Sequence, residues 1–453
     1  MSTKVTLVAH ASALIEIDGL GILSDPWYSG EVFDGSWRLL EENLDVDAIA
    51  FKTTHIYISH EHPDHFHPPT IRRYFSSRSS DVRFLIRSSL DGRVRRWLEK
   101  ENFYVDEVGQ SPLQISDNVE VEVHGVGLYD SLLVVRGRSD CIVNMNDANP
   151  SKYHLLKIAR ELDYVDLLLG QFGFAEWPGP KNDCDAQRRT GRRYLNSLAE
   201  QIEVFKPRLV VPFASFVHFC HPENLWANRN QNSIIDAVQA VEFAGSIPVI
   251  LVNNQTIDIE SSGQDIALSN QVAIAYWSSR VQELSMVTPP ETTERADIHE
   301  ISVLVTEFAN KISMENNRLL VKIARVLIGI CNPLVIRLDD LGSAYFLDPL
   351  VGFIERVDET EPDVTCSTLF LKQVLASEYG PDQALVMMRF DAPSFATAAR
   401  FHRAFAISTL NRCGIKLRFR SLVSRRIINE LVHTLFVYLR WRLGRRREKG
   451  CSP

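Results

Sequence analysis

The segment 59–67, with the sequence SHEHPDHFH, constrains this chain more than any other feature. It follows a short apolar run, residues 55–59, that has the composition of a strand, and it contains an H-x-H-x-D-H pattern made by His60, His62, Asp64 and His65. Imidazole and carboxylate groups are ligands that Zn²⁺ and Fe²⁺ accept. Four such groups within six positions cannot all reach one tetrahedral ion from so short a segment, so the pattern predicts two ions side by side. A histidine-rich polar turn is the alternative, but desolvating so many imidazoles without a partner is costly.

The surrounding pattern predicts a layered α/β structure. Ten of the 13 histidines lie in residues 1–221, which points to a front half that carries the chemistry. Short apolar runs typical of strands alternate with helical spacing up to about residue 260, a pattern that favours layered sheets and helices over a helical bundle. The predicted strands include residues 5–9, 14–17, 22–25, 55–59, 119–124 and 141–145.

The residues around the histidine cluster resemble a known family. H-x-H-x-D-H after a strand is the hallmark of the metallo-β-lactamase superfamily. The opening run VAHASALIEIDG at residues 8–19, followed by ILSDPW at residues 22–27, is similar to the branch that holds ascorbate-6-phosphate lactonases, N-acylphosphatidylethanolamine phospholipase D and CMP-N-acetylneuraminate hydroxylase. The resemblance implies an α/β fold, an αββα sandwich with one or two metals between its sheets, followed here by a smaller α+β C-terminal domain.

The resemblance also implies a ligand set. His60, His62 and His124 would bind one metal, Asp64, His65 and His221 the other, and Asp147 would bridge both. His218 is a second candidate for the last histidine, but the PFA…HP form of residues 212–222 is similar to the hydroxylase branch and favours His221. His10 and Asp25 are expected beside the metals or next to their ligands. His67 is expected to be a solvated neighbour outside the ligand set.

We expect from this family a hydrolase in which two divalent ions, zinc in the first instance, activate a bridging hydroxide. Two cations lower the pKa of a bound water from about 15.7 toward 7, so the hydroxide could attack an ester, amide, lactone or phosphoester. Asp64 and His10 are the residues expected to take part in catalysis.

A dinuclear-iron monooxygenase is the main alternative, and a non-catalytic, metal-stabilised binding module is a second one. The hydroxylase of this branch carries a Rieske cluster, which needs C-x-H and C-x-x-H pairs that this sequence lacks. An oxygenase of this kind would therefore take its electrons from a separate redox partner. The ligand types are compatible with zinc or iron, so they leave the choice open.

The chain is expected to have three parts: residues 1–265 with the metal site, an α+β accessory domain over 266–410, and a basic amphipathic tail over 411–453. The first boundary could lie in the polar segment 257–264 or in 288–296, where Pro, Thr and charges cluster. In the accessory domain we expect helices over 298–328 and 367–375 and a strand over 385–390. Dimerisation or a lid is the simplest role for it, and residues 363–393 also resemble sterol-carrier-like lipid-binding modules.

Charge and cysteine content indicate which partners and which cellular location to expect. The net charge of −8 gives no reason to expect nucleic acid, but residues 412–449 hold twelve Lys and Arg against two Glu, which would suit peripheral contact with an anionic membrane. Seven scattered cysteines without a C-x-x-C pair indicate a reducing, cytoplasmic location. A small-molecule substrate, which could be anionic, is expected, since four arginines gather at residues 188–193, although a solvated helix face explains them equally well.

Overall fold

A computed structural model describes residues 2–89, 91–287, 294–357 and 360–419. Contacts between Cα atoms divide the chain into two compact units. Unit 1 comprises Met1–Val126, Ser131–Glu294 and Gln383–Phe395. Unit 2 comprises Gly127–Asp130, Arg295–Asp382 and the chain from Ala396 onward. A segment from late in the sequence, residues 383–395, thus belongs to the same unit as the histidine cluster.

Unit 1 contains two seven-stranded sheets. In the first, neighbouring strands follow the order β16-β1-β2-β3-β5-β6-β7. Strands β3, β5 and β6 run parallel, and β1 points the same way because β2 is antiparallel to both β1 and β3. The strands of this sheet are β16 (Thr256–Asp258), β1 (Lys4–Ala9), β2 (Ser12–Ile17), β3 (Leu20–Ser24), β5 (His55–Ile58), β6 (Arg83–Arg87) and β7 (Tyr104–Val108).

The second sheet has the order β15-β13-β12-β11-β10-β9-β8. Its β11, β12 and β13 are parallel, whereas β10 and β11 form an antiparallel pair. The strands are β15 (Ile247–Pro248), β13 (Leu209–Phe213), β12 (Leu167–Gln171), β11 (Cys141–Asn144), β10 (Asp130–Arg136), β9 (Val119–Val126) and β8 (Leu113–Ser116).

The two sheets share one apolar core. Alternate residues of β1 and β2, among them Val5, Leu7, Ala13 and Ile15, pack in one cluster with Leu132–Val135 of β10 and Leu167–Leu169 of β12. Inside this core the Tyr57 hydroxyl and the Ser131 hydroxyl lie 2.9 Å apart and connect β5 to β10. The shared core makes the two sheets a sandwich.

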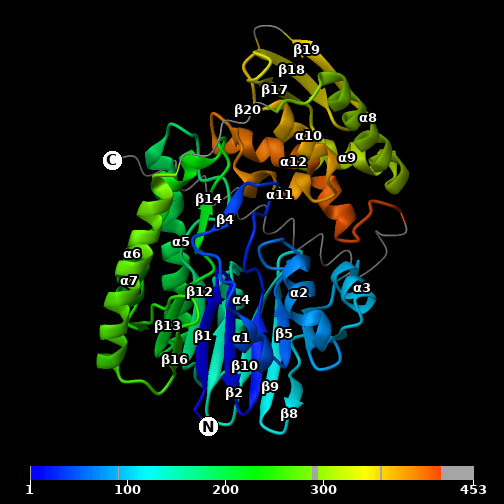
Figure 1. Ribbon diagram of the computed structural model, residues 1–453. Helices are drawn as coiled ribbons and strands as arrows, with labels where there is room; N and C mark the ends of the chain where they lie inside the picture. The colour runs from blue at the N-terminus through cyan, green and yellow to red at the C-terminus, as the bar shows by residue number, and fades with distance from the viewer. Residues whose placement is uncertain (1, 90, 288–293, 358–359, 420–453) are drawn as a thin grey trace. The chain divides into compact units, whose positions relative to one another are not determined.

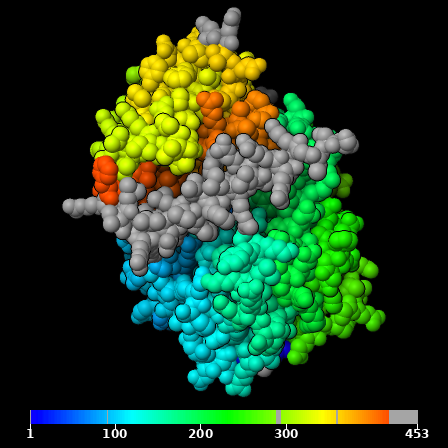
Figure 2. Space-filling view, turned by 180° about the vertical axis from the view of Figure 1, so that it is seen from behind, coloured from blue at the N-terminus to red at the C-terminus, as the bar shows by residue number. Residues whose placement is uncertain are grey.

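Helices cover the sandwich. Figure 1 shows α5, α6 and α7 on one side of the sheets and α2 and α3 on the other. In Figure 2 the visible face of unit 1 runs from blue through cyan to green. The expected α/β fold with an αββα sandwich is confirmed. The helices are α1 (Asp47–Lys52), α2 (Pro68–Phe75), α3 (Arg93–Lys100), α4 (Lys152–Ala159), α5 (Cys184–Phe205), α6 (Ile234–Phe243) and α7 (Gly263–Ser285).

A two-stranded ribbon lies apart from the large sheets in unit 1. It pairs β14 (Val217–Phe219) with β4 (Trp37–Leu39) in antiparallel register, and the 3-10 helix η2 (Leu225–Asn230) follows β14. Trp37 and Phe219 are opposite each other and their rings contact at 5.3 Å between centroids. The ribbon fixes the start of the loop that carries His221.

Unit 2 is a smaller α+β structure, as expected for the C-terminal part. Its strands β17–β20 form a sheet in the order β19-β18-β17-β20, with β17 and β20 parallel. Phe370, Phe401 and Phe405 are buried in its core. The elements are β17 (Leu334–Leu338), β18 (Ser343–Asp348), β19 (Phe353–Val357), β20 (Val364–Cys366), α8 (Ile298–Glu315), α9 (Arg318–Ile328), α10 (Thr368–Ala376) and α12 (Phe395–Arg412).

The two segments named for the first boundary have different surroundings. The polar segment 257–264 ends at the start of α7, where the Ser262 hydroxyl accepts a hydrogen bond from the Asp265 N–H at 3.2 Å, so it contains a helix cap. The change from unit 1 to unit 2 between Glu294 and Arg295 falls within the segment 288–296. The strand predicted over 385–390 is wrong. Residues up to Met387 lie in α11 (Gly380–Met387), and only Phe390–Asp391 form a strand, β21. Short apolar runs do not distinguish a buried helix from a strand.

The basic tail predicted for 411–453 lies largely outside the described residues, which end at residue 419. Within the described part of the chain, no helix combines the length and the apolar character needed to cross a membrane. The six cysteines in that part form no disulfide bond.

Candidate metal centre

Four strands of unit 1 end close together, and the residues that follow them place the histidine and aspartate side chains of the candidate site. His10 follows β1, Asp25 follows β3, His60 comes two residues after the end of β5, and Asp147 follows β11. Because β1, β3 and β5 point the same way, their carboxyl ends meet at one edge of the first sheet. Ligands of open α/β sheets bind at such an edge. The local topology therefore explains why residues spread over 137 positions meet.

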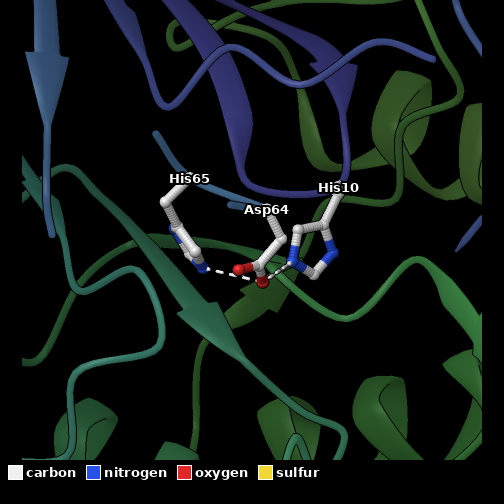
Figure 3. Close-up of side chains that lie close together, drawn as sticks. All are labelled: His10, Asp64 and His65. Atoms are coloured by element: carbon white, nitrogen blue, oxygen red, sulfur yellow. Dashed lines mark ion pairs between the residues drawn. The ribbon is translucent and has the colours of Figure 1, made fainter. Parts of the chain in front are cut away.

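Asp64 lies between two imidazoles. Figure 3 shows the nitrogen atoms of His10 and His65 directed at its carboxylate. Asp64 Oδ2 is 3.4 Å from His10 Nε2 and 3.2 Å from His65 Nε2, and all three residues are buried. Their ligand atoms lie within 4.8 Å of one another, close enough to share one ion.

A second group of ligand atoms adjoins the first and shares His65. Asp147 Oδ2 is 3.4 Å from His65 Nε2, and Asp147 Oδ1 is 3.8 Å from His60 Nδ1. These atoms also lie within 4.8 Å of one another. His62 joins the group through its Nδ1, which is 2.9 Å from His60 Nε2. Without His62, each of the two groups contains two histidines and one aspartate, and His65 is common to both.

Asp25 holds the cluster together from behind. Its carboxylate accepts hydrogen bonds from the Ser59 N–H and the Ser59 hydroxyl, both at 2.8 Å, and lies 3.0 Å from His65 Nδ1. The Asn146 side-chain amide also donates to it. With Nδ1 of His65 held by Asp25, Nε2 is the nitrogen directed at Asp64 and Asp147. A ligand histidine is commonly oriented by a carboxylate in this way.

The electrostatics of the cluster suit a cation. Burial lowers the pKa of His60 well below its usual value and also lowers the pKa of His62 and of His10, so these imidazoles are neutral. Burial opposes ionisation of Asp64, but His65 and His10 hold its pKa well below the usual value. Burial also opposes a charge on His65, yet Asp64 and Asp147 raise its pKa well above the usual value. The carboxylates thus attract positive charge, which a metal ion would supply.

Buried polar atoms provide a direct test of fit. Among the described residues, Asp64 Oδ1, Asp147 Oδ1 and His10 Nδ1 are buried and make no hydrogen bond. Leaving a buried acceptor unsatisfied costs about 1–3 kcal/mol, and more for a charged group. Two carboxylates with a spare oxygen, set beside neutral imidazoles, match the ligand types that zinc and iron prefer. The residues present therefore fit a metal centre.

The structure does not bring His124 into this cluster. His124 Nε2 lies 2.7 Å from Glu122 Oε2, and the other oxygen of Glu122 pairs with Arg136. Side chains alternate along β9, so Glu122 and His124 share one face while Val121 and Val123 lie in the apolar core. The spacing that suggested a ligand is explained by this buried network.

His221 lies in the loop after β14. Its ring Nδ1 accepts a hydrogen bond from the Glu223 N–H at 3.2 Å and is 3.5 Å from Glu223 Oε2. It is not part of the two groups of ligand atoms within 4.8 Å. His218 lies on β14 itself and pairs in register with Arg38, so it belongs to the ribbon.

Other candidate residues have structural surroundings. His67 Nδ1 is 2.8 Å from the Thr70 hydroxyl at the start of α2. The arginine cluster lies on an exposed face of α5, where Arg188 pairs with Asp185 at 3.3 Å. Sequence reasoning missed Ser59, Asn146 and Glu223, which are the neighbours that orient histidines. The adjacency of Ser59 to His60 was visible, but its bond to Asp25 depends on the tertiary structure.

Residues 4–132 match a family model described as the beta-lactamase superfamily domain. Unit 1 has the layering of sheets and helices that is typical of the metallo-β-lactamase fold. A protein described as a Rieske 2Fe-2S iron-sulfur protein of Mycolicibacterium smegmatis is 30% identical over 239 residues, which are 49% of this chain and 45% of that protein. The cytidine monophosphate-N-acetylneuraminic acid hydroxylase of Cricetulus griseus is 26% identical over 235 residues, 49% of this chain and 41% of that protein. The match thus spans less than half of either relative.

Solved structures with similar folds include hydroxylases and hydrolases. CmlA, a diiron beta-hydroxylase from Streptomyces venezuelae, aligns with a TM-score of 0.40 at 19% identity, over 57% of this chain and 54% of that one. A metallo hydrolase from Ignicoccus hospitalis aligns with a TM-score of 0.40 at 15% identity, over 57% of this chain and 98% of that one.

Proposed function

We propose that this chain is a metal-dependent enzyme with a dinuclear centre. His60, His62 and Asp147 would hold one ion, and Asp64 and His65 would hold the other with His221, while Asp147 would also reach the second ion. The observation that carries the proposal is the pair of adjoining groups, His60, His65 and Asp147 in one and His10, Asp64 and His65 in the other, whose ligand atoms lie within 4.8 Å of one another. His62 is added because its Nδ1 lies 2.9 Å from His60 Nε2, and His221 is added from the family resemblance. Asp25 and His10 are proposed to orient His65 and Asp64.

Between oxygenation and hydrolysis, we propose oxygenation by a dinuclear iron centre. Two histidines and one carboxylate with open positions are typical of non-haem Fe(II) oxygenases. His124, which the resemblance assigned to the first ion, pairs with Glu122 instead, so two histidines remain for that ion. The hydroxylases among the similar proteins support the same choice. This reverses the order expected from the sequence pattern.

When bound, iron would supply the redox chemistry that activates oxygen, with electrons from a separate protein donor. The residues of the chain hold and shield the centre. Asp25 keeps the proton of His65 on Nδ1 and so leaves Nε2 free to bind. His10 stands 3.4 Å from Asp64 and limits rotation of that carboxylate. The burial of His60, Asp64 and His65 keeps bulk water away from the ligands.

Metal analysis of protein purified without added metal tests this proposal, together with its optical spectrum under reducing and oxygenated conditions. We expect about two irons per chain, as for a dinuclear site, and a spectrum that changes when oxygen is admitted to the reduced protein. Two zincs and no response to oxygen would overturn the oxygenase proposal.

Hydrolysis is the second candidate. Catalytic zinc is also held by two histidines and a carboxylate, so the same ligand types favour it, and hydrolysis needs no electron donor. If zinc is found, hydrolysis of ester, lactone and phosphoester probes should be lost together with the metal in Asp64→Ala. Retained turnover without metal would exclude this candidate as well.

A further inference from the structure

The segment Gln383–Phe395 is built into unit 1 by hydrogen bonds to three separate parts of the chain, the loop with Trp177, strand β4 and the loop after β14. Its backbone carbonyl groups accept these bonds at 2.8–2.9 Å. The Trp177 N–H donates to the carbonyl of Leu385, the Trp37 indole N–H donates to that of Val386, and the Asn224 side-chain amide donates to that of Met387. The Trp177 ring also stacks on Phe390, with 5.7 Å between centroids. The segment therefore has a fixed position beside the loop that carries His221.

Arg389 is the basic residue of this segment, and its side chain is fully buried. Its Nε donates to Glu223 Oε2 at 2.6 Å, and its Nη1 donates to the Asp34 carbonyl oxygen at 3.3 Å. A buried guanidinium is costly unless it is paired and hydrogen-bonded. The pair with Glu223 compensates the charge and removes most of the freedom of the Glu223 side chain.

Glu223 in turn contacts the imidazole of His221. Its N–H donates to His221 Nδ1 at 3.2 Å, and its Oε2, the atom that Arg389 holds, is 3.5 Å from the same nitrogen. Both contacts are on the Nδ1 side of the ring. For Nε2 to bind a metal ion the ring proton must be on Nδ1, where Glu223 Oε2 can accept it in place of the contact with the N–H. Carboxylates behind ligand histidines set the ring orientation and raise its basicity.

We propose that Arg389 is a positioning residue that acts through Glu223 to orient His221 toward a metal ion. The proposal rests on the function proposed above, because it requires His221 to bind metal. A planar guanidinium suits this role, since it fixes the plane of a carboxylate, whereas a lysine would provide only a point charge. The segment 383–395 would thereby contribute to a site whose other members come from residues 10–221.

Titration of the metal-free full-length chain with Co²⁺, followed by its visible absorption, tests the proposal without an activity assay. We expect two binding steps in the wild type. Arg389→Met should weaken one of them by about 10–100-fold, the range seen when partners outside the ligand set are removed. Arg389→Lys should give an intermediate affinity. Glu223→Gln is the second variant, in case Arg389→Met lowers the folded fraction seen by circular dichroism.

A double variant separates positioning from a general structural effect. If Arg389 acts through His221, Arg389→Met should have no further effect on Co²⁺ binding in a His221→Ala background, whereas independent contributions would add. The matched control is Arg136→Met, which removes an arginine from the Arg136–Glu122–His124 network of the same unit. It should leave both Co²⁺ affinities unchanged.

The outcomes distinguish the two proposals. A wild-type chain that binds fewer than two Co²⁺, or a His221→Ala variant that binds two with wild-type affinity, contradicts the proposed ligand set. Two normal steps in the wild type, one lost in His221→Ala, and unchanged affinities in folded Arg389→Met or Glu223→Gln overturn the role of Arg389 alone. Additive effects in the double variant overturn it as well.

Discussion

Unit 1 contains two arginine–glutamate–histidine networks that differ in which ring nitrogen the glutamate contacts. In the first, Glu122 contacts Nε2 of His124, and its other oxygen pairs with Arg136. In the second, Glu223 contacts Nδ1 of His221 and pairs with Arg389. The first histidine has its outer nitrogen occupied, while the second has it available. The same residue types thus produce a structural group in one place and a candidate ligand in the other.

The origin of the partners differs as well. Glu122, His124 and Arg136 come from the neighbouring strands β9 and β10, so the network is local to one sheet. Glu223 and Arg389 are 166 positions apart, and the second network exists only because residues 383–395 pack into unit 1. A strand network stabilises the sheet that contains it, whereas a loop fixed by a distant segment can be shaped for a ligand.

The largest effect is expected at the candidate metal centre itself, which only the second network is proposed to serve. Asp64→Ala removes the carboxylate between His10 and His65, so we expect loss of most bound metal and of activity. The loss should exceed the 10–100-fold typical of residues outside the ligand set. Elemental analysis with an activity assay measures it. His67→Ala is the control from the same segment, and full metal content in Asp64→Ala would contradict the assignment.

The comparison between the two histidines gives the next largest effect. His221→Ala should lower the metal content from about two ions per chain to about one, because it removes a ligand of a dinuclear site. His124→Ala should leave about two, because its Nε2 is already used by Glu122. Metal stoichiometry after gel filtration measures both. Equal metal loss in the two variants would mean that the networks do not differ as described.

Much of the fold follows from local pattern. The strands predicted at residues 5–9, 22–25 and 55–59 correspond to β1, β3 and β5, because apolar alternation and flanking glycine determine them locally. The strand predicted over 385–390 was wrong because the structure there depends on tertiary contacts and not on local pattern. Ala384, Met387 and Met388 are buried by tertiary contacts that a short, mostly apolar run does not specify.

The candidate site divides in a similar way. His60, His62, Asp64 and His65 were visible together because they lie within six positions after one strand. Asp147 and His10 come from other strands, yet the superfamily pattern located them. The pattern also named His124 as a ligand. The structure places its imidazole against Glu122, two residues away on the same face of β9. Arg389 carried no signal, since nothing in its local sequence indicates contact with residue 223.

The first network should affect stability and leave metal binding unchanged. Arg136→Met leaves the carboxylate of Glu122, which is 3% exposed, without its arginine. Removing one partner of a buried pair costs about 3–5 kcal/mol, and we expect the lower end because His124 remains. Urea denaturation measures it. Arg83→Met, at an exposed pair with Asp106, is the control and should cost at most about 1 kcal/mol. Similar losses in both variants would show that the first network is not stabilising.

The last prediction concerns His218, the alternative to His221, which lies on β14 just before the loop that carries His221. Burial, with Arg38 adding to it, lowers the pKa of His218 from 6.5 to about 4. The unfolded chain therefore binds a proton below pH 6.5 that the folded chain does not bind until about pH 4, so the folded state loses stability as the pH falls through this window. The loss from this group is at most about 1.4 kcal/mol per pH unit.

In His218→Gln this contribution is absent, so the free energy of unfolding should fall less steeply between pH 6.5 and 4 than in the wild type. Urea denaturation at several pH values measures the difference in slope. Because His218 lies in the β4–β14 ribbon, the difference should be the same with metal bound and with metal removed. A difference that appears only in the metal-loaded protein would mean that His218 on β14, and not His221, is the metal ligand. The Arg389–Glu223–His221 network would then not serve the metal centre, and the contrast between the two networks would not hold.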